Sequence, residues 1–280
     1  MRLPEWIRTR NLPDQHNIKH LLRRHALSTV CEEARCPNRG ECFAKPTATF
    51  MILGRNCTRN CGFCSVSSLG PEAMDDNEPE NVAAAAEELE LRYIVITSVT
   101  RDDLPDGGAG QFAKTIKALR KRIPGVKIEV LTPDFLGDPD PLRTVLEAGP
   151  DVFNHNVETT ARLYPVVRPS ADYERSLSVL ETAKKIAPHI YTKSGFMLGL
   201  GETYDEAITI LEELRKVACD FVTIGQYLRP TKKNLPVVKY IRPEVFEDLR
   251  LKALDMGFKY AASGPLVRSS MNAEEMFEDV

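Results

Sequence analysis

The sequence lacks the features by which several broad classes of protein are recognised. No apolar run approaches the roughly 20 residues of a membrane-spanning helix, and the N-terminus has no apolar signal-peptide core. A formal net charge of -3 over 280 residues gives no overall attraction to nucleic acid. We therefore expect a cytoplasmic protein that binds neither membrane nor nucleic acid.

Common catalytic and nucleotide-binding motifs are absent as well. The sequence contains no H-E-x-x-H helix, no phosphate-binding loop, no glycine-rich dinucleotide fingerprint and no Ser-His-Asp set. Cysteine is concentrated instead, since six of the seven cysteines lie between Cys31 and Cys64. Cytoplasmic thiols stay reduced, so this concentration indicates metal or redox chemistry rather than disulfides. Cys219 stands apart and is expected in the core.

The first cysteine triplet to consider is Cys57, Cys61 and Cys64, spaced C-x-x-x-C-x-x-C with no fourth cysteine in the run. Three thiolates on a loop can hold three irons of a four-iron cluster, which leaves the fourth iron for a ligand that is not a cysteine. Zinc binding and redox chemistry remain alternatives, although a zinc site usually has a fourth Cys or His close by.

A second triplet, Cys31, Cys36 and Cys42, lies shortly upstream with C-x4-C-x5-C spacing. Pro37, Asn38 and Gly40 between and beside these cysteines predict an irregular turn. Two triplets can mean two clusters or one six-ligand zinc site. We favour two clusters, because each triplet is complete in itself.

From residue 47 onward, short apolar segments alternate with amphipathic helices. This alternation predicts a parallel sheet covered by helices. Six such units without a dinucleotide fingerprint favour an α/β fold of the partial (β/α)6 TIM-type barrel kind. The predicted strands are 47–53, 93–97, 126–131, 151–156, 190–198, 221–226 and 259–262, and the predicted helices are 81–91, 111–122, 139–148, 172–186, 203–217 and 243–256.

We divide the chain into an N-terminal extension with a cysteine motif (1–46), the barrel (47–262) and a C-terminal segment that closes the site (263–280). A helix from Asp14 to Thr29, capped by Asp14, is expected in the extension. Active sites of such barrels lie at the C-terminal ends of the strands. The Cys57 loop follows the first barrel strand, so we expect it there.

Polar residues after the other strands are candidates for binding a small ligand. Thr97 and Ser98 offer hydroxyls, although a capped turn explains them equally well. Strand alternation would place Asn156 and Glu158 on one face, where they could bind a ribose diol. Arg168 suits a carboxylate or a surface salt bridge. Tyr227 at the end of the sixth strand could flank an adenine.

The loop 229–242 contains only basic charges, namely Arg229, Lys232, Lys233, Lys239 and Arg242. It is either a solvated loop or a docking surface for an acidic partner.

Both triplets and several further segments resemble a known family. The Cys57 triplet resembles the cluster motif of radical S-adenosylmethionine (SAM) enzymes, and the Cys31 triplet resembles that of lipoyl synthases. The resemblance covers residues 10–271, and Met271 departs from it because the family usually has Tyr there. Further matching segments are Pro37-Asn38, Glu41-Cys42-Phe43, 97–103, 154–159, 167–169, 193–202, 225–230 and 264–270.

The resemblance implies lipoyl synthase activity with two 4Fe–4S clusters. Cys57, Cys61 and Cys64 would hold the cluster whose open iron binds the amino and carboxylate groups of SAM. One electron then cleaves SAM to methionine and a 5′-deoxyadenosyl radical. This radical removes hydrogen from C6 and C8 of a protein-bound octanoyl-lysine, so that two SAM molecules are used per lipoyl group. Together with Ser270, these three cysteines are the implied catalytic residues.

The second cluster implied by the resemblance is an auxiliary one, held by Cys31, Cys36, Cys42 and Ser270, which gives up two sulfur atoms. By analogy with related biotin-forming enzymes, the implied SAM contacts are Asn156 and Glu158 to the ribose and Arg168 to the carboxylate, with Thr97, Ser98 and Tyr227 as further cofactor-binding candidates.

The implied partners are octanoylated carrier domains, an electron donor and an iron–sulfur carrier that rebuilds the auxiliary cluster. The carriers would be the glycine cleavage H protein and the E2 subunits of 2-oxoacid dehydrogenases, and the donor a flavodoxin or ferredoxin. A radical enzyme of the biotin-synthase type and a zinc-stabilised or cluster-carrying binding module are the rival interpretations.

Overall fold

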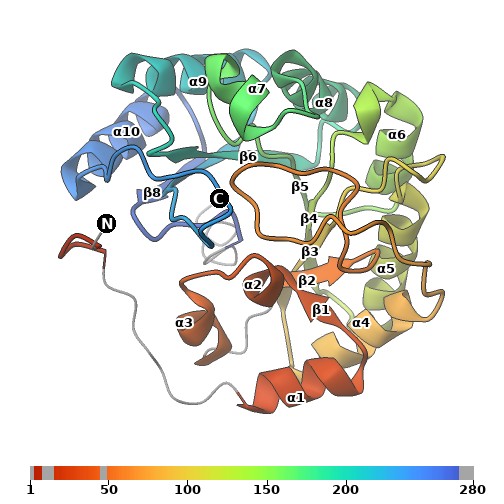
Figure 1. Ribbon diagram of the computed structural model, residues 1–280. Helices are drawn as coiled ribbons and strands as arrows, with labels where there is room; N and C mark the ends of the chain where they lie inside the picture. Colours follow the sequence, from red (N-terminus) through yellow and green to blue (C-terminus); the bar gives the residue numbers. More distant parts are fainter. Residues whose placement is uncertain (1–2, 8–15, 45–48, 271–280) are drawn as a thin grey trace. The chain divides into compact units, whose positions relative to one another are not determined.

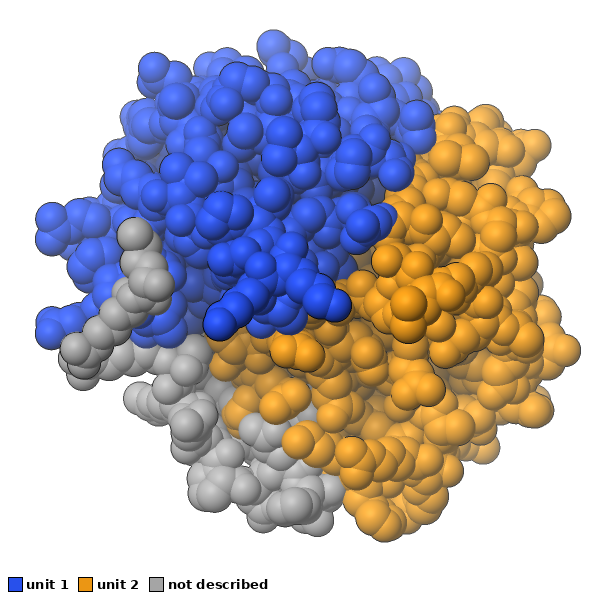
Figure 2. All heavy atoms as spheres, in the orientation of Figure 1, with its two compact units in different colours: residues 1–9, 60–64, 154–280 blue, residues 10–59, 65–153 orange. Residues whose placement is uncertain are grey.

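The computed structural model describes residues 3–7, 16–44 and 49–270 (Figure 1). These residues form two compact units, coloured separately in Figure 2. Unit 1 contains residues 1–9, 60–64 and 154–280, and unit 2 contains residues 10–59 and 65–153.

The strands of unit 2 that build its parallel ladder are buried on both faces. Phe50 and Ile52 of β2 are fully buried, as are Ile94 and Ile96 of β3. Such strands read as continuous apolar runs, which is typical of parallel sheets covered by helices. In sequence order, unit 2 contains α1 (His16–Arg24), β1 (Ser28–Thr29), α2 (Val30–Glu33), α3 (Arg39–Ala44), β2 (Thr49–Ile52), α4 (Glu78–Glu88), β3 (Tyr93–Ser98), α5 (Ala109–Arg122), β4 (Lys127–Leu131), η1 (Phe135–Gly137) and α6 (Pro139–Glu147), followed by most of β5 (Val152–Asn154).

Strand β1 pairs with β2 in antiparallel fashion, whereas β2–β3 and β3–β4 are parallel. The helices α4, α5 and α6 lie beside this ladder (Figure 1). Phe112, Ile116 and Leu119 of α5 are fully buried at helical spacing, so one apolar stripe attaches this helix.

Unit 1 repeats the same pattern with β6, β7 and β8 in parallel register. Its helix α9 begins with a capping box, in which Thr203 and Glu206 each bond the other's backbone N–H. Unit 1 contains η2 (Ala161–Leu163), α7 (Tyr164–Val167), α8 (Tyr173–Ile186), β6 (Tyr191–Leu198), α9 (Tyr204–Lys216), β7 (Phe221–Gln226), α10 (Pro243–Asp255) and β8 (Tyr260–Gly264).

The strand order follows the chain from β1 to β8, and a helix lies between each strand from β2 onward and the next. This arrangement confirms the predicted α/β fold of the partial (β/α)6 TIM-type barrel. Among the described residues, no helix has both the length and the apolar character needed to cross a membrane. The division into 1–46, 47–262 and 263–280 stays a prediction.

The predicted helix from Asp14 to Thr29 is wrong at its C-terminal end. Helix α1 ends at Arg24 because Ala26 adopts a left-handed conformation (φ 54°). The backbone N–H of Leu27 then donates to the carbonyl of Leu22 (2.8 Å), which is a Schellman ending. The capping residue Asp14 lies outside the described residues. The second cysteine triplet, predicted on irregular backbone, lies instead around two short helices, α2 and α3.

At the end of β7, the fully buried side chain of Gln226 joins three backbone segments of unit 1. Its Nε2 donates to the carbonyls of Leu198 (3.0 Å) and Lys239 (3.1 Å), and its Oε1 accepts from the N–H of Ile241 (2.8 Å). The carbonyl end of β6 and the loop before α10 are thus held at the end of β7.

Replacing this side chain by an apolar one of similar size should destabilise the fold. Gln226→Leu leaves buried backbone groups without partners, so we expect the free energy of unfolding to fall by about 2–3 kcal/mol. Chemical denaturation measures this difference. A change below about 0.5 kcal/mol would contradict the bridging role.

Candidate functional site

Cys57 lies in unit 2, in the loop that follows β2. Its Sγ accepts hydrogen bonds from the backbone N–H groups of Arg59 (3.4 Å) and Thr100 (3.3 Å). The loop is fixed there because the N–H of Thr58 donates to the carbonyl of Thr100 (3.0 Å). Hydrogen bonds to a ligating sulfur tune the electronic properties of an iron–sulfur cluster. Cys57 is therefore already surrounded by the donors that such a ligand uses.

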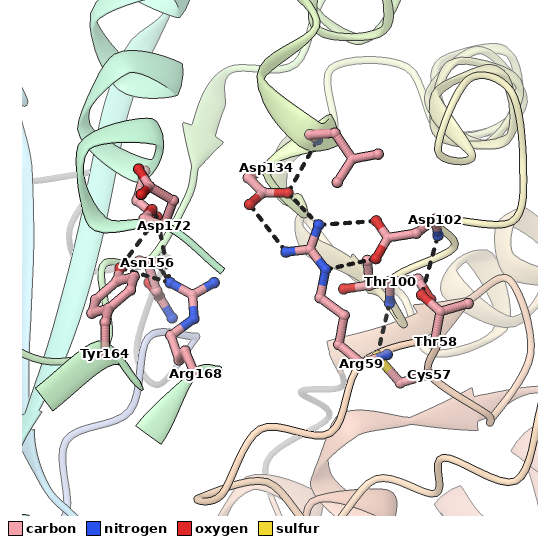
Figure 3. A network of polar contacts seen from close by, with 12 residues as sticks. Cys57, Thr58, Arg59, Thr100, Asp102, Asp134, Asn156, Tyr164, Arg168 and Asp172 are labelled. Carbon is pink, nitrogen blue, oxygen red and sulfur yellow. Dashed lines mark hydrogen bonds and ion pairs between the residues drawn. The ribbon is translucent and has the colours of Figure 1, made fainter. Parts of the chain in front are cut away.

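Arg59, between Cys57 and Cys61, makes one buried and one partly buried ion pair within unit 2 (Figure 3). Its Nε and Nη2 donate to the Asp102 carboxylate (2.7 and 2.9 Å), and its Nη1 and Nη2 to the Asp134 carboxylate (3.0 and 2.6 Å). Burial alone would lower the pKa of Arg59, but these carboxylates raise it above the ordinary value. Both pairs are bidentate, which fixes the guanidinium and the backbone that carries it.

Cys61 and Cys64 belong to unit 1, where other backbone segments fix their positions. The N–H of Gly62 donates to the carbonyl of Val167 (2.9 Å), and its carbonyl accepts from the N–H of Leu235 (3.0 Å). The Asn234 amide donates to the carbonyl of Cys64 (2.7 Å). A Cβ at Gly62 would lie 2.8 Å from Leu235 Cδ1 and 3.1 Å from the backbone carbonyl oxygen of Val166, so a larger residue would displace its neighbours.

Phe63 packs on an apolar cluster formed by Val167, Leu200 and Tyr227. Tyr227 is 2% exposed, and its hydroxyl donates to the carbonyl of Leu235 (2.8 Å). Burial raises the pKa of Tyr227 to about 12. The structure thus places this predicted adenine neighbour beneath the cysteine loop, within the core of unit 1.

Asn156 and Glu158 meet, as predicted, but not because they continue a strand. Strand β5 ends at Asn154, so the predicted extension to residue 156 is wrong. Glu158 has a left-handed backbone (φ 66°), and its carboxylate accepts from Asn156 Nδ2 (3.1 Å). Desolvation raises the pKa of Glu158 even though the charge of Arg168 opposes that rise.

Arg168 is 9% exposed and therefore makes no surface salt bridge. Its Nη1 donates to the carbonyl of Asn156 (3.1 Å) and to the hydroxyl of Tyr164 (2.9 Å), as Figure 3 shows. Its Nε is buried without a hydrogen-bond partner in the described chain. The side chain is therefore held in place at one end of the guanidinium and retains a donor at the other.

The two serines after β8 differ in their surroundings. Asn154 Nδ2 donates to Ser269 Oγ (2.8 Å), and Ser269 Oγ donates to Asn156 Oδ1 (3.1 Å). No hydrogen bond involves the hydroxyl of Ser270 within the described residues, and this residue is half-buried. Of the pair, Ser270 is the one whose oxygen remains available to a ligand.

Thr97 and Ser98 end β3 in unit 2. The hydroxyl of Thr97 donates to the carbonyl of Leu131 (3.0 Å), which is a structural bond. The hydroxyl of Ser98 is buried and has no hydrogen-bond partner in the described part of the chain. Only Ser98 therefore offers a hydroxyl that the fold has not already used.

The upstream triplet is gathered by α2, α3 and the turn between them. The N–H of Cys36 donates to the carbonyl of Cys31 (3.1 Å), and that of Cys42 to the carbonyl of Asn38 (3.0 Å). Burial, together with the neighbouring Cys36 and Cys42, raises the pKa of the Cys31 thiol to about 12. Because the thiols lie close enough to influence one another, a bound cation would replace the protons that they otherwise keep.

The donor set of each triplet fits an iron–sulfur cluster. All seven cysteines are free thiols. Among the described residues, no three His, Cys, Asp or Glu side chains converge on the position of a single metal ion. A four-iron cluster does not require such convergence, since each thiolate binds a different iron. Three thiols in each triplet are the kind of donors that such a cluster takes.

Comparison with known proteins agrees with this chemistry. Residues 51–214 match the family model described as the Radical SAM superfamily. The chain is 55% identical to the lipoyl synthase of Caldanaerobacter subterraneus subsp. tengcongensis, over 98% of this chain and 96% of that protein. The chain belongs to the lipoyl synthase family. It is also 54% identical to the lipoyl synthase of Rubrobacter xylanophilus, over 99% of this chain and 87% of that one.

A solved structure supports the fold of this lipoyl synthase family member independently. Methylornithine synthase (PylB) superimposes with a TM-score of 0.52 at 14% identity, covering 94% of this chain and 88% of that one. The predicted resemblance and the predicted barrel are both confirmed.

Sequence reasoning identified the candidate ligands but missed the residues that hold the cysteine loop in place. Arg59 and Asp134 are far apart in the sequence, and Asn234 lies in a loop considered only for its charge. The available signal was an arginine inside a cysteine loop that is expected to be sheltered from solvent. A buried guanidinium requires carboxylate partners, so these partners could have been sought.

The two partners of Arg59 should differ in what they contribute to stability. The Asp134 side chain is fully buried, whereas that of Asp102 is 28% exposed. Asp134→Ala leaves a buried charge partly unpaired, so we expect a loss of about 3 kcal/mol, against about 1 kcal/mol for Asp102→Ala. Denaturation of both variants in urea measures this, and equal losses would refute the ranking.

Proposed function

We propose that this protein inserts two sulfur atoms, at C6 and C8, into an octanoyl-lysine carried by a lipoyl carrier protein, which makes it a sulfurtransferase of the radical SAM kind. The observation that carries the proposal is the presence of two separate cysteine triplets in a chain that matches lipoyl synthases over nearly its whole length. The Cys57 triplet is sufficient for a cluster that forms the radical. The Cys31 triplet is the additional feature that sulfur insertion would require.

SAM and 4Fe–4S chemistry characterise the radical SAM superfamily. We assign the cluster that would bind SAM to Cys57, Cys61 and Cys64. When bound, SAM and this cluster supply a radical able to break unactivated C–H bonds, which acids and bases of side chains cannot do. The chain contributes rigid placement. Arg59 holds the backbone N–H that reaches Cys57 Sγ, and Gly62 is held on both sides by backbone hydrogen bonds.

We assign the auxiliary cluster, and with it the count of two, to Cys31, Cys36, Cys42 and Ser270. Ser270 is preferred to Ser269 because the hydroxyl of Ser269 is already bonded to two asparagine side chains. A hydroxyl ligand binds iron more weakly than a thiolate, so it suits a cluster that must later be taken apart.

For SAM itself, we propose that Asn156 and Glu158 bind the ribose hydroxyls. Their mutual hydrogen bond aligns an amide with a carboxylate, and a bound diol would compensate the desolvation that raises the pKa of Glu158. The Arg168 guanidinium, with its unpaired Nε, is assigned to the SAM carboxylate, and the Ser98 hydroxyl to a polar group of SAM. Thr97 and Tyr227 would lie behind the residues that contact SAM, because their hydroxyls already donate to backbone carbonyls.

Two rival functions make different predictions. A radical enzyme of the biotin-synthase type would not need the Cys31 triplet, and a zinc- or cluster-carrying binding module would not cleave SAM. We further propose octanoylated H protein and E2 domains as substrates, flavodoxin or ferredoxin as reductant, an iron–sulfur carrier for cluster renewal, and a cytoplasmic location, where thiols stay reduced.

The function is tested by anaerobic turnover of an octanoyl-lysine peptide, followed by mass spectrometry and metal analysis. Reconstituted protein should contain about eight irons and eight sulfides per chain and should form the lipoyl product. Bound zinc without iron, or an iron-replete sample that forms neither thiolated nor dithiolated peptide, would refute the proposal.

Single cysteine replacements should separate the two triplets. Cys36→Ala should keep about four irons and still form 5′-deoxyadenosine, but no lipoyl product. Cys61→Ala should keep a similar iron content and lose SAM cleavage altogether. Both variants losing SAM cleavage equally would contradict the division of labour.

The assignment of the serine ligand is tested by a matched pair. In a Cys61→Ala background, which isolates the auxiliary cluster, Ser270→Ala should change the electron paramagnetic resonance spectrum of the reduced cluster. Ser269→Ala should leave the spectrum nearly unchanged. The reverse result would make Ser269 the ligand.

A further inference from the structure

The loop between β7 and α10 is positively charged, and hydrogen bonds within it fix its backbone. Residues 229–242 include five basic residues and no acidic one, in a chain whose formal net charge is -3. Lys232, Lys233 and Lys239 are exposed, and no ion pair involves them within the described residues. Val238 beside them is 61% exposed. This surface therefore combines unpaired cations with an apolar side chain, as the edges of protein interfaces do.

The turn that presents Lys232 and Lys233 is built without using their side chains. Arg229 donates from Nε to the carbonyl of Asn234 (2.7 Å) and from Nη2 to that of Lys232 (2.5 Å). The hydroxyl of Thr231 donates to Asn234 Oδ1 (2.7 Å) and accepts from the N–H of Lys233 (3.2 Å). The backbone at the two lysines is thus ordered before any partner arrives, which lowers the entropic cost of binding.

The same turn holds the cysteine loop of unit 1. Asn234 donates from Nδ2 to the carbonyl of Cys64 (2.7 Å), and Leu235 donates from its N–H to the carbonyl of Gly62 (3.0 Å). Lys233 is therefore adjacent in the chain to Asn234, whose side chain holds the carbonyl of Cys64. A solvated loop would not need this placement.

We propose that Lys232 and Lys233 form a docking surface for an acidic face of the octanoylated carrier domain. This inference rests on the proposed function, which requires a protein-bound acyl-lysine to reach the site. Opposite charges near the acylated lysine would steer the carrier and orient it, mainly through the rate of association. The acyl chain itself would still be recognised within the barrel.

The test compares two substrates on one enzyme. Lys232→Glu/Lys233→Glu should raise KM for octanoylated H protein roughly tenfold, because attraction becomes repulsion at two positions. KM and kcat for a short octanoyl-lysine peptide should stay within about twofold, since a peptide has no face to dock. The KM of the unmodified enzyme for H protein should also rise with ionic strength, and that of the double variant should not.

The control is the charge reversal Lys117→Glu/Lys121→Glu on α5. These two lysines are exposed on the surface of unit 2, and no ion pair involves them within the described residues. The control changes the net charge by the same amount as Lys232→Glu/Lys233→Glu but outside the proposed docking surface. It should therefore leave KM for H protein unchanged. Lys232→Gln/Lys233→Gln provides a milder variant, for which a smaller rise is expected.

The outcomes separate the inference from the function on which it rests. Unchanged KM for H protein in both Lys232/Lys233 variants, or equal loss with the control pair, would overturn the docking surface while lipoyl formation persists. Equal loss with peptide and H protein would also overturn it, because the lysines would then act on the site itself. Failure of the unmodified enzyme on the peptide would instead refute the proposed function.

Discussion

The ion pairs of Arg59 with Asp102 and Asp134 are the interaction on which the position of Cys57 depends. A guanidinium with a side chain only 4% exposed is costly unless its donors are satisfied, and here two carboxylates satisfy it. Because Arg59 is two residues from Cys57, fixing its side chain also fixes the backbone N–H that reaches the sulfur. The two ion pairs of Arg59 therefore give the start of the cysteine loop, at Cys57, a defined position.

A different device fixes the other end of the same loop. Cys61 and Cys64 belong to unit 1, where backbone hydrogen bonds from Gly62 and the amide of Asn234 hold them. Phe63 anchors this half to a small apolar cluster that includes Tyr227. The proposed ligands are thus supported by groups that take no part in the proposed chemistry, which is how ligands of a reactive metal site are kept in place.

The fold was largely predictable from the sequence, whereas the residues that hold the cysteine loop in place were not. Alternation of apolar segments and helices predicted the barrel, because parallel strands buried on both faces have a simple pattern. The spacing of the cysteines was enough to propose them as cluster ligands. By contrast, the ending of α1 at Ala26 and the turn at Glu158 depend on left-handed backbone at non-glycine residues, which composition does not reveal.

The buried positions of Tyr227 and Arg168 illustrate the same limit. Both residues were predicted to face a ligand, but the sequence did not reveal that the Tyr227 hydroxyl donates to a backbone carbonyl or that part of the Arg168 guanidinium donates to Tyr164. Pairings between residues far apart in the sequence, such as Asn154 with Ser269, depend on the tertiary fold. They could not be read from either segment alone.

We propose that the protein itself supplies the sulfur, from a cluster on Cys31, Cys36 and Cys42. This proposal is tested most directly by reconstituting the protein with heavy-isotope sulfide and measuring the mass of the lipoyl product from a single turnover in unlabelled buffer. We predict that both inserted sulfurs carry the label. An unlabelled product formed by labelled, iron-replete protein would contradict the account.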